Sequence, residues 1–350
     1  MNERYCGCWT ALVTPFRKKF AVDWEQLERN VDFQISEGVT GVLPMGSTGE
    51  SATVTNTEHS KIIEEVAGQA KGKCMVLAGT GSNSTEEAIH ETGKAVEAGV
   101  DAVLLVDCYY NKPSSLELRK EYYEVILKRY PNLDVIAYAI PGRSVTVISP
   151  EDLALLRGSY PNFVGVKEAT GDFERMRRTR ELLGGDFNII SGDDPNTYQM
   201  MTDPEIRASG VVSVISNITP GPIEKYASLI LAGKTDEAQK IDEALAPLFS
   251  VVGVKTTEKV TLPNGTTAEV TYRFPNPVPL KTMMAGLGVQ DATCKQPLGK
   301  LTKQGVEIVR GALRTVWENT PQMLEPVGRF YGVDVGERIS DDKNWKKLSY

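Results

Sequence analysis

The sequence predicts an α/β protein, with a (β/α)8 barrel in residues 1–232 and a C-terminal helical appendage in residues 233–350 that carries an inserted β-hairpin at about 255–274. Three observations support this prediction. Short apolar, β-branched runs alternate with amphipathic segments up to residue 232, as repeated βα units do. There are eight such runs, which matches the strand number of a closed barrel. Polar residues follow most of these runs directly.

Composition and charge indicate a globular protein and argue against nucleic-acid or membrane binding. The chain of 350 residues is 41% hydrophobic and 24% charged, which supplies enough apolar material for a large core. A formal net charge of −7 argues against a broad basic surface for nucleic acid or anionic lipid. The first residues contain no long apolar segment, and no later stretch approaches the roughly 18 apolar residues of a spanning helix. We therefore expect a cytoplasmic protein without nucleic-acid or membrane partners, and we expect its five scattered cysteines to be reduced.

The barrel elements are assigned in chain order. The predicted strands are Trp9–Thr14, Val39–Met45, Lys73–Ala78, Ala102–Asp107, Asp134–Tyr138, Phe163–Lys167, Phe187–Ser191 and Gly210–Ile215. The predicted helices between them include Trp24–Glu37, Thr57–Ala70, Thr85–Ala98, Leu116–Lys128 and Asp172–Leu183. Asp23 and Thr57 are predicted N-caps, because short polar side chains accept hydrogen bonds from the free N–H groups of a first helical turn.

The position of the polar residues favours a barrel over an open sheet. A doubly wound open sheet would give the same alternation of strands and helices. In a barrel, however, reactive groups gather at the carboxyl ends of the strands. The polar segments that follow the apolar runs are Gly46–Glu50, Tyr109–Asn111, Tyr138, Lys167–Glu168 and Gly192–Asp194.

The pattern after residue 232 becomes helical, most clearly in residues 233–250 and 277–288. Lys255–Phe274 breaks this pattern with two alternating Thr- and Val-rich runs around Asn264-Gly265, and Asn-Gly between such runs is a strong hairpin signal. Gly328–Tyr350 is polar and irregular, and we expect it to wrap the surface or fray.

Lys167 is the first candidate for chemistry, because it ends an apolar run at the predicted mouth of the barrel. Loss of solvation there disfavours the ammonium form and lowers the pKa of the amine. A neutral amine can attack a ketone and form an imine. Taken alone, a lysine at a strand end is more often a surface residue with its ammonium in water.

Two neighbouring features strengthen the case for Lys167. Tyr138 ends the fifth run, where a tuned phenol can carry protons between reaction intermediates, although an isolated rim tyrosine more often only packs. Gly46–Glu50 offers hydroxyls and backbone N–H groups that can hold a carboxylate, although an ordinary loop has the same composition.

Other classes of site find little support. Gly79–Ser84 lacks the third glycine of a dinucleotide fingerprint. Two histidines and no Cys-x-x-Cys pair argue against zinc. Asp193-Asp194 would suit magnesium, but such a pair more often caps the next helix. We therefore expect no cofactor and no metal.

Four motifs in order resemble the dihydrodipicolinate synthase / N-acetylneuraminate lyase family. The resemblance covers about residues 7–315. The motifs are Gly46–Glu50, Tyr109–Pro113, Tyr138 with Pro141–Arg143, and Val164–Gly171.

The resemblance implies a pyruvate-dependent class I aldolase. In such an enzyme Lys167 forms a Schiff base with pyruvate, and Tyr138, Thr48 and Tyr110 form a proton relay. Tyr110 would come from the neighbouring subunit of a dimer. The implied assembly is a homotetramer, a dimer of dimers, that takes only small-molecule substrates.

The resemblance also implies how the two substrates are held. Ser47 and Thr48 would hold the pyruvate carboxylate, and Gly192 and Val212 would complete the substrate-binding set. Arg143 would bind the carboxylate of aspartate 4-semialdehyde, since its planar guanidinium can donate two parallel hydrogen bonds to a carboxylate. The expected reaction belongs to lysine and diaminopimelate biosynthesis.

Several departures from the synthase pattern leave the second substrate open. Ser47 stands where synthases often have threonine, Ala139 replaces a frequent asparagine, Val145 replaces the usual glycine, and the hairpin is atypical. The alternative is another aldolase or lyase of the family that acts on N-acetylneuraminate or a 2-keto-3-deoxy sugar acid. A non-catalytic keto-acid sensor is disfavoured, because a sensor has no need of the relay residues.

Lysine is a further implied ligand, as a feedback inhibitor at the dimer interface. Asn83 and Glu87 are four residues apart and can face one pocket, while Asn56 and His59 can line the opposite wall. The positions implied by the resemblance are Ser51, Ala52, Asn56, His59, Asn83, Glu87 and Tyr109.

Overall fold

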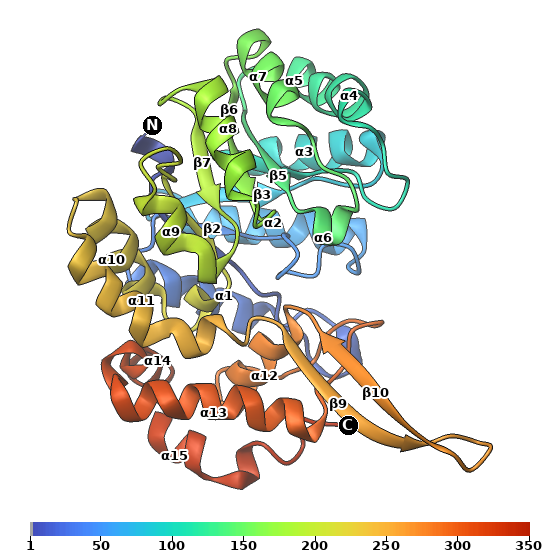
Figure 1. The fold of residues 1–350 in the computed structure, drawn as a ribbon, viewed down its shortest axis with the longest axis vertical. Helices are drawn as coiled ribbons and strands as arrows, with labels where there is room; N and C mark the ends of the chain where they lie inside the picture. Colours follow the sequence, from blue (N-terminus) through green and yellow to red (C-terminus); the bar gives the residue numbers. More distant parts are fainter. Residues whose placement is uncertain (1–2) are drawn as a thin grey trace. The chain divides into compact units, whose positions relative to one another are not determined.

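The computed structural model describes residues 3–350, which form two compact units (Figure 1). Unit 1 consists of the residues up to Leu12 together with Glu28–Asp242, and unit 2 consists of Val13–Leu27 together with Glu243–Tyr350. Helices α1 (Trp24–Ser36) and α11 (Thr235–Phe249) each begin in one unit and end in the other.

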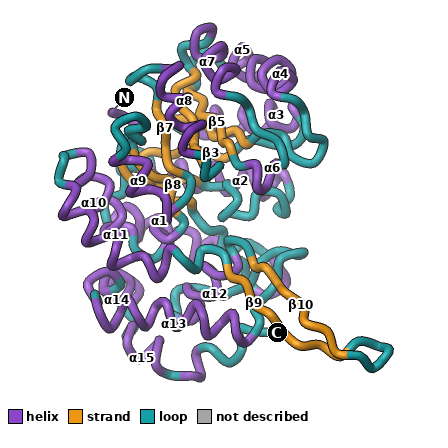
Figure 2. The backbone as a smooth tube through the Cα atoms, in the orientation of Figure 1, coloured by secondary structure: helices purple, strands orange, loops and turns teal. Residues whose placement is uncertain are grey.

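Unit 1 is a closed barrel of eight parallel strands in the order β1 to β8, which confirms the predicted fold class. Figure 2 shows the strands enclosed by helices. β8 closes the barrel against β1, where Cys8 lies opposite Val211. The strands are β1 (Gly7–Ala11), β2 (Gly41–Leu43), β3 (Met75–Gly79), β4 (Ala102–Val106), β5 (Asp134–Ala139), β6 (Phe163–Glu168), β7 (Asn188–Ser191) and β8 (Gly210–Ser213).

Each strand of the barrel is followed by at least one helix. The β4 crossover contains a π-helical turn, η3 (Leu118–Tyr123), between two short helices. The remaining helices of unit 1 are α2 (Asn56–Ala70), α3 (Thr85–Ala98), α4 (Ser115–Glu117), α5 (Glu124–Arg129), α6 (Pro141–Ser144), α7 (Pro150–Ser159), α8 (Phe173–Leu183), α9 (Thr197–Thr202) and α10 (Pro220–Leu231).

The barrel interior is a packed apolar core. Every strand contributes one large apolar side chain to a single buried cluster, because alternate residues of a barrel strand point inward. These side chains are Trp9, Leu43, Leu77, Leu104, Ile136, Val164, Ile190 and Val212. The interior is therefore filled, and chemistry is confined to the strand ends.

The predicted N-cap of α2 was wrong by two residues. Thr57 lies inside the helix, and Thr55 is the N-cap. The Thr55 hydroxyl accepts from the Glu58 backbone N–H at 3.2 Å, and the Glu58 carboxylate accepts from the Thr55 N–H at 2.9 Å. This reciprocal capping box satisfies two free donors, whereas a cap at Thr57 lacks the acidic residue three positions on.

Unit 2 contains the predicted hairpin. Strands β9 (Val254–Thr261) and β10 (Thr267–Phe274) pair antiparallel, with Thr257 opposite Thr271. In the connecting turn, the Asn264 side chain accepts from the Thr266 N–H at 3.0 Å. The hairpin predicted from Asn264-Gly265 is therefore confirmed.

An early segment of the chain, Val13–Leu27, packs within unit 2. Phe16 is 1% exposed, and its ring lies under the ammonium groups of Lys281 at 4.3 Å and Lys295 at 5.4 Å. The helices are α12 (Val278–Gly286), α13 (Lys303–Asn319), α14 (Glu325–Tyr331) and α15 (Val335–Ser340).

The expectation that Gly328–Tyr350 is irregular was wrong. This segment contains the end of α14, all of α15 and a short 3-10 turn (Asp342–Asn344). Trp345 is 2% exposed and donates from its indole to the Arg338 carbonyl at 2.9 Å. Arg310 of α13 donates to the Ile339 carbonyl at 2.7 Å. The contact between Arg310 and Ile339 joins residues far apart in sequence, so no local pattern signalled it.

Candidate active site

Lys167 lies at the carboxyl end of the barrel, in register with Tyr138 on β5 and Ile190 on β7. Its side chain is 6% exposed, and Nζ is 4.0 Å from the centroid of the Tyr138 ring. Burial, together with the positive charge of Arg143, lowers the pKa of Lys167 to about 7, against the opposing influence of Asp194. A large fraction of the amine is therefore neutral at neutral pH and available as a nucleophile.

Gly192 makes room for the Lys167 side chain. A methyl group at Gly192 would stand 2.9 Å from Lys167 Cε and 3.0 Å from Lys167 Cγ. The Gly192 backbone N–H donates to the Glu168 carbonyl at 2.8 Å, which fixes the turn after β7 beside β6. The absence of a side chain at Gly192 thus sets the path of the lysine.

Tyr138 is 6% exposed, and its phenol lies close enough to the Ser47 hydroxyl for that hydroxyl to affect its pKa. Burial raises the pKa of Tyr138 to about 12, while the charge of Arg143 and the nearby Ser47 hydroxyl favour the phenolate and limit the rise. The phenol is protonated at neutral pH and can donate a proton to an oxygen beside Lys167. Sequence reasoning paired Ser47 with the substrate carboxylate, and the structure adds its contact with Tyr138.

The segment Gly46–Glu50 forms consecutive tight turns after β2. The Gly49 N–H donates to the Gly46 carbonyl at 3.1 Å, and the Glu50 N–H donates to the Ser47 carbonyl at 3.2 Å. Thr48 is 3% exposed within these turns. The structure therefore places Thr48 next to Ser47, at the same end of the barrel as Lys167.

Arg143 and Tyr110 lie on two exposed segments at this end of the barrel. Arg143 is exposed in the short helix α6, close enough to Lys167 and Tyr138 to influence both pKa values. Tyr110 follows β4 and is 82% exposed. Val212 lies on β8 within the apolar barrel core, below the polar groups of the strand ends.

Asp193 and Asp194 do not cap the helix that follows them, contrary to the more common role considered for such a pair. The Asp194 carboxylate accepts from the N–H groups of Val214 at 2.9 Å and Ile215 at 3.1 Å, which ties β7 to the segment after β8. Burial raises the pKa of Asp194 to about 6. Within residues 3–350, no group of three His, Cys, Asp or Glu side chains is arranged to hold a metal ion.

The residues considered for lysine come from three segments, which are the loop and first turn of α2, the start of α3 and the loop after β4. Asn56 is exposed at the start of α2, whereas His59 is buried, with Nδ1 2.8 Å from Glu91 Oε2 on α3. Glu87 accepts a hydrogen bond from Ser82. Ser51, Asn83 and Tyr109 are partly buried, and Ala52 is exposed. The His59 side chain is therefore directed toward α3.

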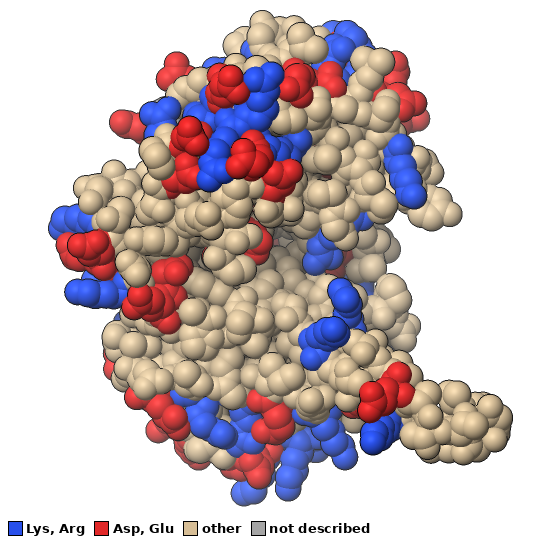
Figure 3. All heavy atoms as spheres, viewed as in Figure 1, with Lys and Arg blue, Asp and Glu red and all other residues tan. Residues whose placement is uncertain are grey.

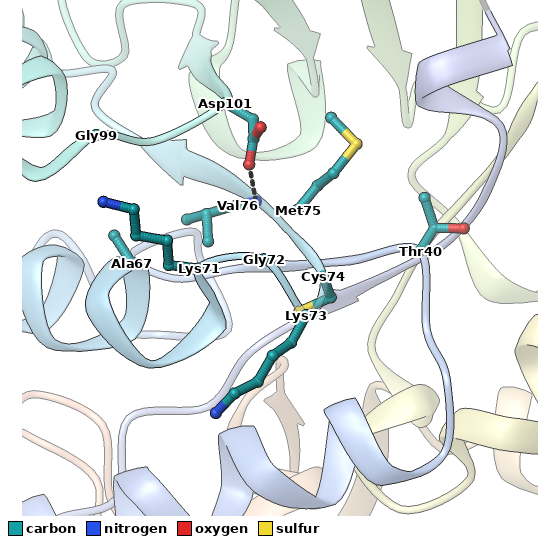
Figure 4. A pocket seen from close by; sticks show the side chains of 10 residues that line it. All are labelled: Thr40, Ala67, Lys71, Gly72, Lys73, Cys74, Met75, Val76, Gly99 and Asp101. Carbon is teal, nitrogen blue, oxygen red and sulfur yellow. Dashed lines mark hydrogen bonds between the residues drawn. The ribbon is translucent and has the colours of Figure 1, made fainter.

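A pocket of about 360 Å³ lies at the opposite, amino-terminal ends of β2, β3 and β4 (Figure 4). In it, the Asp101 carboxylate accepts from the Val76 N–H at 2.9 Å, and the Lys71 and Lys73 side chains extend in different directions. Burial raises the pKa of the Cys74 thiol in its wall to about 11, so the thiol is not a ready nucleophile. This pocket shares no residue with the strand-end site.

Acidic and basic side chains are interspersed on the face drawn in Figure 3. No helix within residues 3–350 combines the length and the apolar character needed to cross a membrane.

Comparison with known proteins gives one consistent family. Residues 4–315 match the model of the Dihydrodipicolinate synthetase family. The 4-hydroxy-tetrahydrodipicolinate synthase of Teredinibacter turnerae is 35% identical over 297 residues, which are 85% of this chain and 94% of that protein. The corresponding synthase of Cellvibrio japonicus is 36% identical, over 88% of this chain and 98% of that protein.

Solved structures agree with the sequence comparison. The 4-hydroxy-tetrahydrodipicolinate synthase of Methylacidiphilum fumariolicum SolV is 35% identical with a TM-score of 0.80, and the match covers 92% of this chain and 99% of that one. The lysine-bound DHDPS of Cyanidioschyzon merolae is 31% identical with a TM-score of 0.79, over 89% of this chain and 98% of that one.

Proposed function

The chain belongs to the Dihydrodipicolinate synthetase family, and we propose that it condenses pyruvate with aspartate 4-semialdehyde as a class I aldolase. The observation that carries this proposal is Lys167, a buried amine at a barrel strand end with a pKa lowered to about 7 and Nζ 4.0 Å from the Tyr138 ring centroid. The product would be 4-hydroxy-tetrahydrodipicolinate, and the reaction would serve lysine and diaminopimelate biosynthesis.

The proposed chemistry begins on pyruvate. The neutral Lys167 amine attacks the C2 carbonyl, and the carbinolamine loses water to give an imine. Tyr138, Thr48 and Tyr110 form the proposed relay, in which Tyr138 supplies a proton to the departing oxygen because its pKa of about 12 keeps it protonated. Loss of a proton from the pyruvate methyl group then gives the enamine nucleophile.

The second half of the reaction uses the acceptor substrate, aspartate 4-semialdehyde. The enamine carbon attacks the aldehyde, whose oxygen takes a proton from the relay. The acceptor amine then displaces Lys167 by transimination, which closes the ring and frees the enzyme. Arg143 holds the acceptor carboxylate, while Ser47 and Thr48 hold the pyruvate carboxylate in a site completed by Gly192 and Val212. The chemistry depends on the lysine imine, and we propose no cofactor or metal.

Arg143 favours aspartate 4-semialdehyde over a neutral sugar aldehyde as the acceptor. Its exposed guanidinium lies near Lys167 and is suited to a carboxylate. The two curated relatives named above are also synthases rather than sugar-acid lyases. A coupled assay that compares aspartate semialdehyde with N-acetylmannosamine and glyceraldehyde discriminates between these acceptors.

We also propose a homo-oligomer, a dimer of dimers, in which Tyr110 enters the neighbouring subunit's site. Its exposed fraction of 82% in the single chain suits such a role. Mixing Tyr110→Phe with Lys167→Ala protein should restore activity, because subunit exchange creates some sites with both residues intact. The cytoplasmic location expected from the sequence stays a proposal, which cell fractionation can test.

Borohydride reduction in the presence of pyruvate tests the central step. We expect a stable pyruvate adduct on Lys167, located by peptide mass spectrometry, and no adduct in Lys167→Ala. Lys281 is the internal comparison, because it is also fully buried but donates to the Thr293 carbonyl at 3.0 Å. An adduct on Lys281, or none at all, would overturn the mechanism.

A further inference from the structure

Asp107 is a fully buried carboxylate that the proposed mechanism does not use. It directly follows β4, and its backbone N–H donates to the Tyr138 carbonyl at 3.2 Å. Its Oδ1 accepts from the Tyr123 hydroxyl at 2.6 Å, and its Oδ2 accepts from the Ile148 backbone N–H at 3.1 Å. Each carboxylate oxygen therefore holds a different part of the chain.

The contact with Ile148 fixes the end of the segment that carries Arg143. That segment leaves β5 at Ile140, forms α6 and continues to Ser149. Two further hydrogen bonds tie it to the segment after β4: Thr146 Oγ1 donates to the Pro113 carbonyl at 2.6 Å, and the Ser149 N–H donates to Ser115 Oγ at 2.8 Å. Of the three links, only the one to Asp107 ends on a fully buried side chain at the root of both segments.

Within the segment, Arg143 is coupled to these anchors through a short path. The Ser144 hydroxyl lies 2.9 Å from the Ile140 carbonyl and 2.6 Å from the Thr146 carbonyl, which bridges the base of α6 to the anchored stretch. A shift of the backbone at Ile148 would therefore move α6, the short helix that carries Arg143.

We propose that Asp107 is a positioning residue for the acceptor: by holding the Ile148 N–H beside β4, it fixes the Arg143 segment in the conformation that binds the acceptor carboxylate. This inference rests on the proposed function. It assigns to Asp107 a role in acceptor recognition and none in imine formation at Lys167.

The hydrogen bonding of Asp107 can persist in either protonation state. Burial raises the pKa of Asp107 to about 7, opposed by Tyr123, the Ile148 N–H and Arg175 and supported by Glu168. A proton on Oδ1 can point toward Tyr123, whose hydroxyl also lies 3.2 Å from the Leu105 carbonyl and can donate there instead. Oδ2 then still accepts from Ile148. An asparagine amide can adopt the same pattern, with its oxygen toward Ile148.

Three substitutions separate positioning from general stability. Asp107→Leu keeps the branched shape of the side chain but removes both oxygens that accept hydrogen bonds. It should raise the KM for the aldehyde roughly tenfold, the scale of one hydrogen bond to a charged group. Asp107→Asn should restore the wild-type KM. Tyr123→Phe, the matched control, removes the other partner from the same buried cluster and should leave that KM unchanged. The extent of borohydride trapping at saturating pyruvate, measured well above pH 7 where the Lys167 amine is neutral, should be equal in all four proteins.

A double-mutant cycle with Arg143→Ala supplies the decisive comparison. If Asp107 acts through Arg143, Asp107→Leu should cause no further loss of kcat/KM for the aldehyde in the Arg143→Ala background. Additive losses would overturn the inference, as would a wild-type aldehyde KM in Asp107→Leu. Should Asp107→Leu fail to fold, a raised KM in Asp107→Asn would overturn it. Absence of a pyruvate adduct in wild-type protein would instead overturn the proposed function, and this inference with it.

Discussion

A methyl group added to Gly192 would stand 2.9 Å from Cε of Lys167, so these two residues cannot both keep their positions if the glycine is replaced. The conflict involves the flexible lysine stem and the Ala169 methyl group rather than the backbone. A side chain at Gly192 should therefore displace the Lys167 side chain while the backbone of the barrel stays in place.

We accordingly expect Gly192→Ala to slow imine formation by roughly tenfold or more, because a displaced nucleophile loses its attack geometry, while the fold is retained. The rate of borohydride trapping with pyruvate measures the first effect, and thermal unfolding measures the second. Gly158→Ala is the matched control, since a methyl group there meets nothing within 4 Å. Wild-type trapping in Gly192→Ala would contradict the assigned lysine geometry.

The pH dependence of imine formation should follow the Lys167 amine. Because its pKa is lowered to about 7, the neutral fraction and the rate of trapping should rise as the pH increases through 7. Removal of the positive charge in Arg143→Ala should raise the pKa of Lys167. The increase in trapping rate should therefore occur at higher pH in this variant. Arg143→Lys keeps the charge and should keep the wild-type profile. An identical profile in Arg143→Ala would exclude the proposed electrostatic coupling.

Arg143→Ala should also weaken use of aspartate semialdehyde by about two orders of magnitude in kcat/KM, the scale of a lost bidentate, charge-assisted contact. Steady-state assays at saturating pyruvate measure this loss. Normal turnover of the semialdehyde by this variant would point to a different acceptor.

Val145 stores backbone strain at the same end of the barrel. It is 57% exposed with φ of 63°, a conformation that a β-branched residue rarely adopts. Val145→Gly should raise the free energy of unfolding by about 1 kcal/mol, since relief of strain exceeds the added entropy of the unfolded chain. Urea unfolding measures the change, and Val145→Ala should gain less. A less stable glycine variant would show that the strain is negligible.

The β9–β10 hairpin should be dispensable for imine chemistry, because its two strands pair only with each other. We propose oligomer contact or surface protection as its role. A variant in which a short turn replaces residues 255–274 should still form the pyruvate adduct. If that variant folds but cannot bind pyruvate, the hairpin contributes to the active site after all.

Lysine should inhibit the enzyme at millimolar concentration. The positions that the family resemblance implies for its binding are Ser51, Ala52, Asn56, His59, Asn83, Glu87 and Tyr109. Asn83 Oδ1 is buried without a hydrogen-bond partner among the described residues, and the nearby Glu87 carboxylate can take an ammonium group. Glu87→Gln should weaken inhibition, whereas Glu86→Gln, its exposed neighbour, should not. Initial rates across a lysine titration measure the effect, and unchanged activity would remove the proposal without touching the catalytic assignment.

Local patterns in the sequence were sufficient for the barrel and for the position of Lys167. Apolar runs specify buried parallel strands, and a lysine that ends such a run has to lie at the rim. The α3 range Thr85–Ala98 was predicted to the residue. In the structure, Ser84 caps its start and Gly99, with φ of 79°, ends it.

The remaining contacts depend on residues that the fold brings together. Nothing near Asp107 in the sequence reveals Ile148 as its partner, and nothing near Trp345 predicts its burial. Likewise, the influence of Ser47 on the pKa of Tyr138 connects the ends of β2 and β5, which do not pair with each other. Such contacts follow from barrel closure and from the packing of short helices, which a single sequence does not specify.

The discontinuous composition of unit 2 has a consequence for synthesis on the ribosome. Val13–Leu27 emerges early, but the helices that cover it belong to residues after Glu243 and are made only after the entire barrel. Until then Phe16, which is 1% exposed in the finished molecule, has no lysine-bearing helix to shield it. The nascent chain therefore carries the apolar side chains of Phe16 and Val22 without this cover throughout barrel synthesis, where chaperones that bind exposed apolar groups can act.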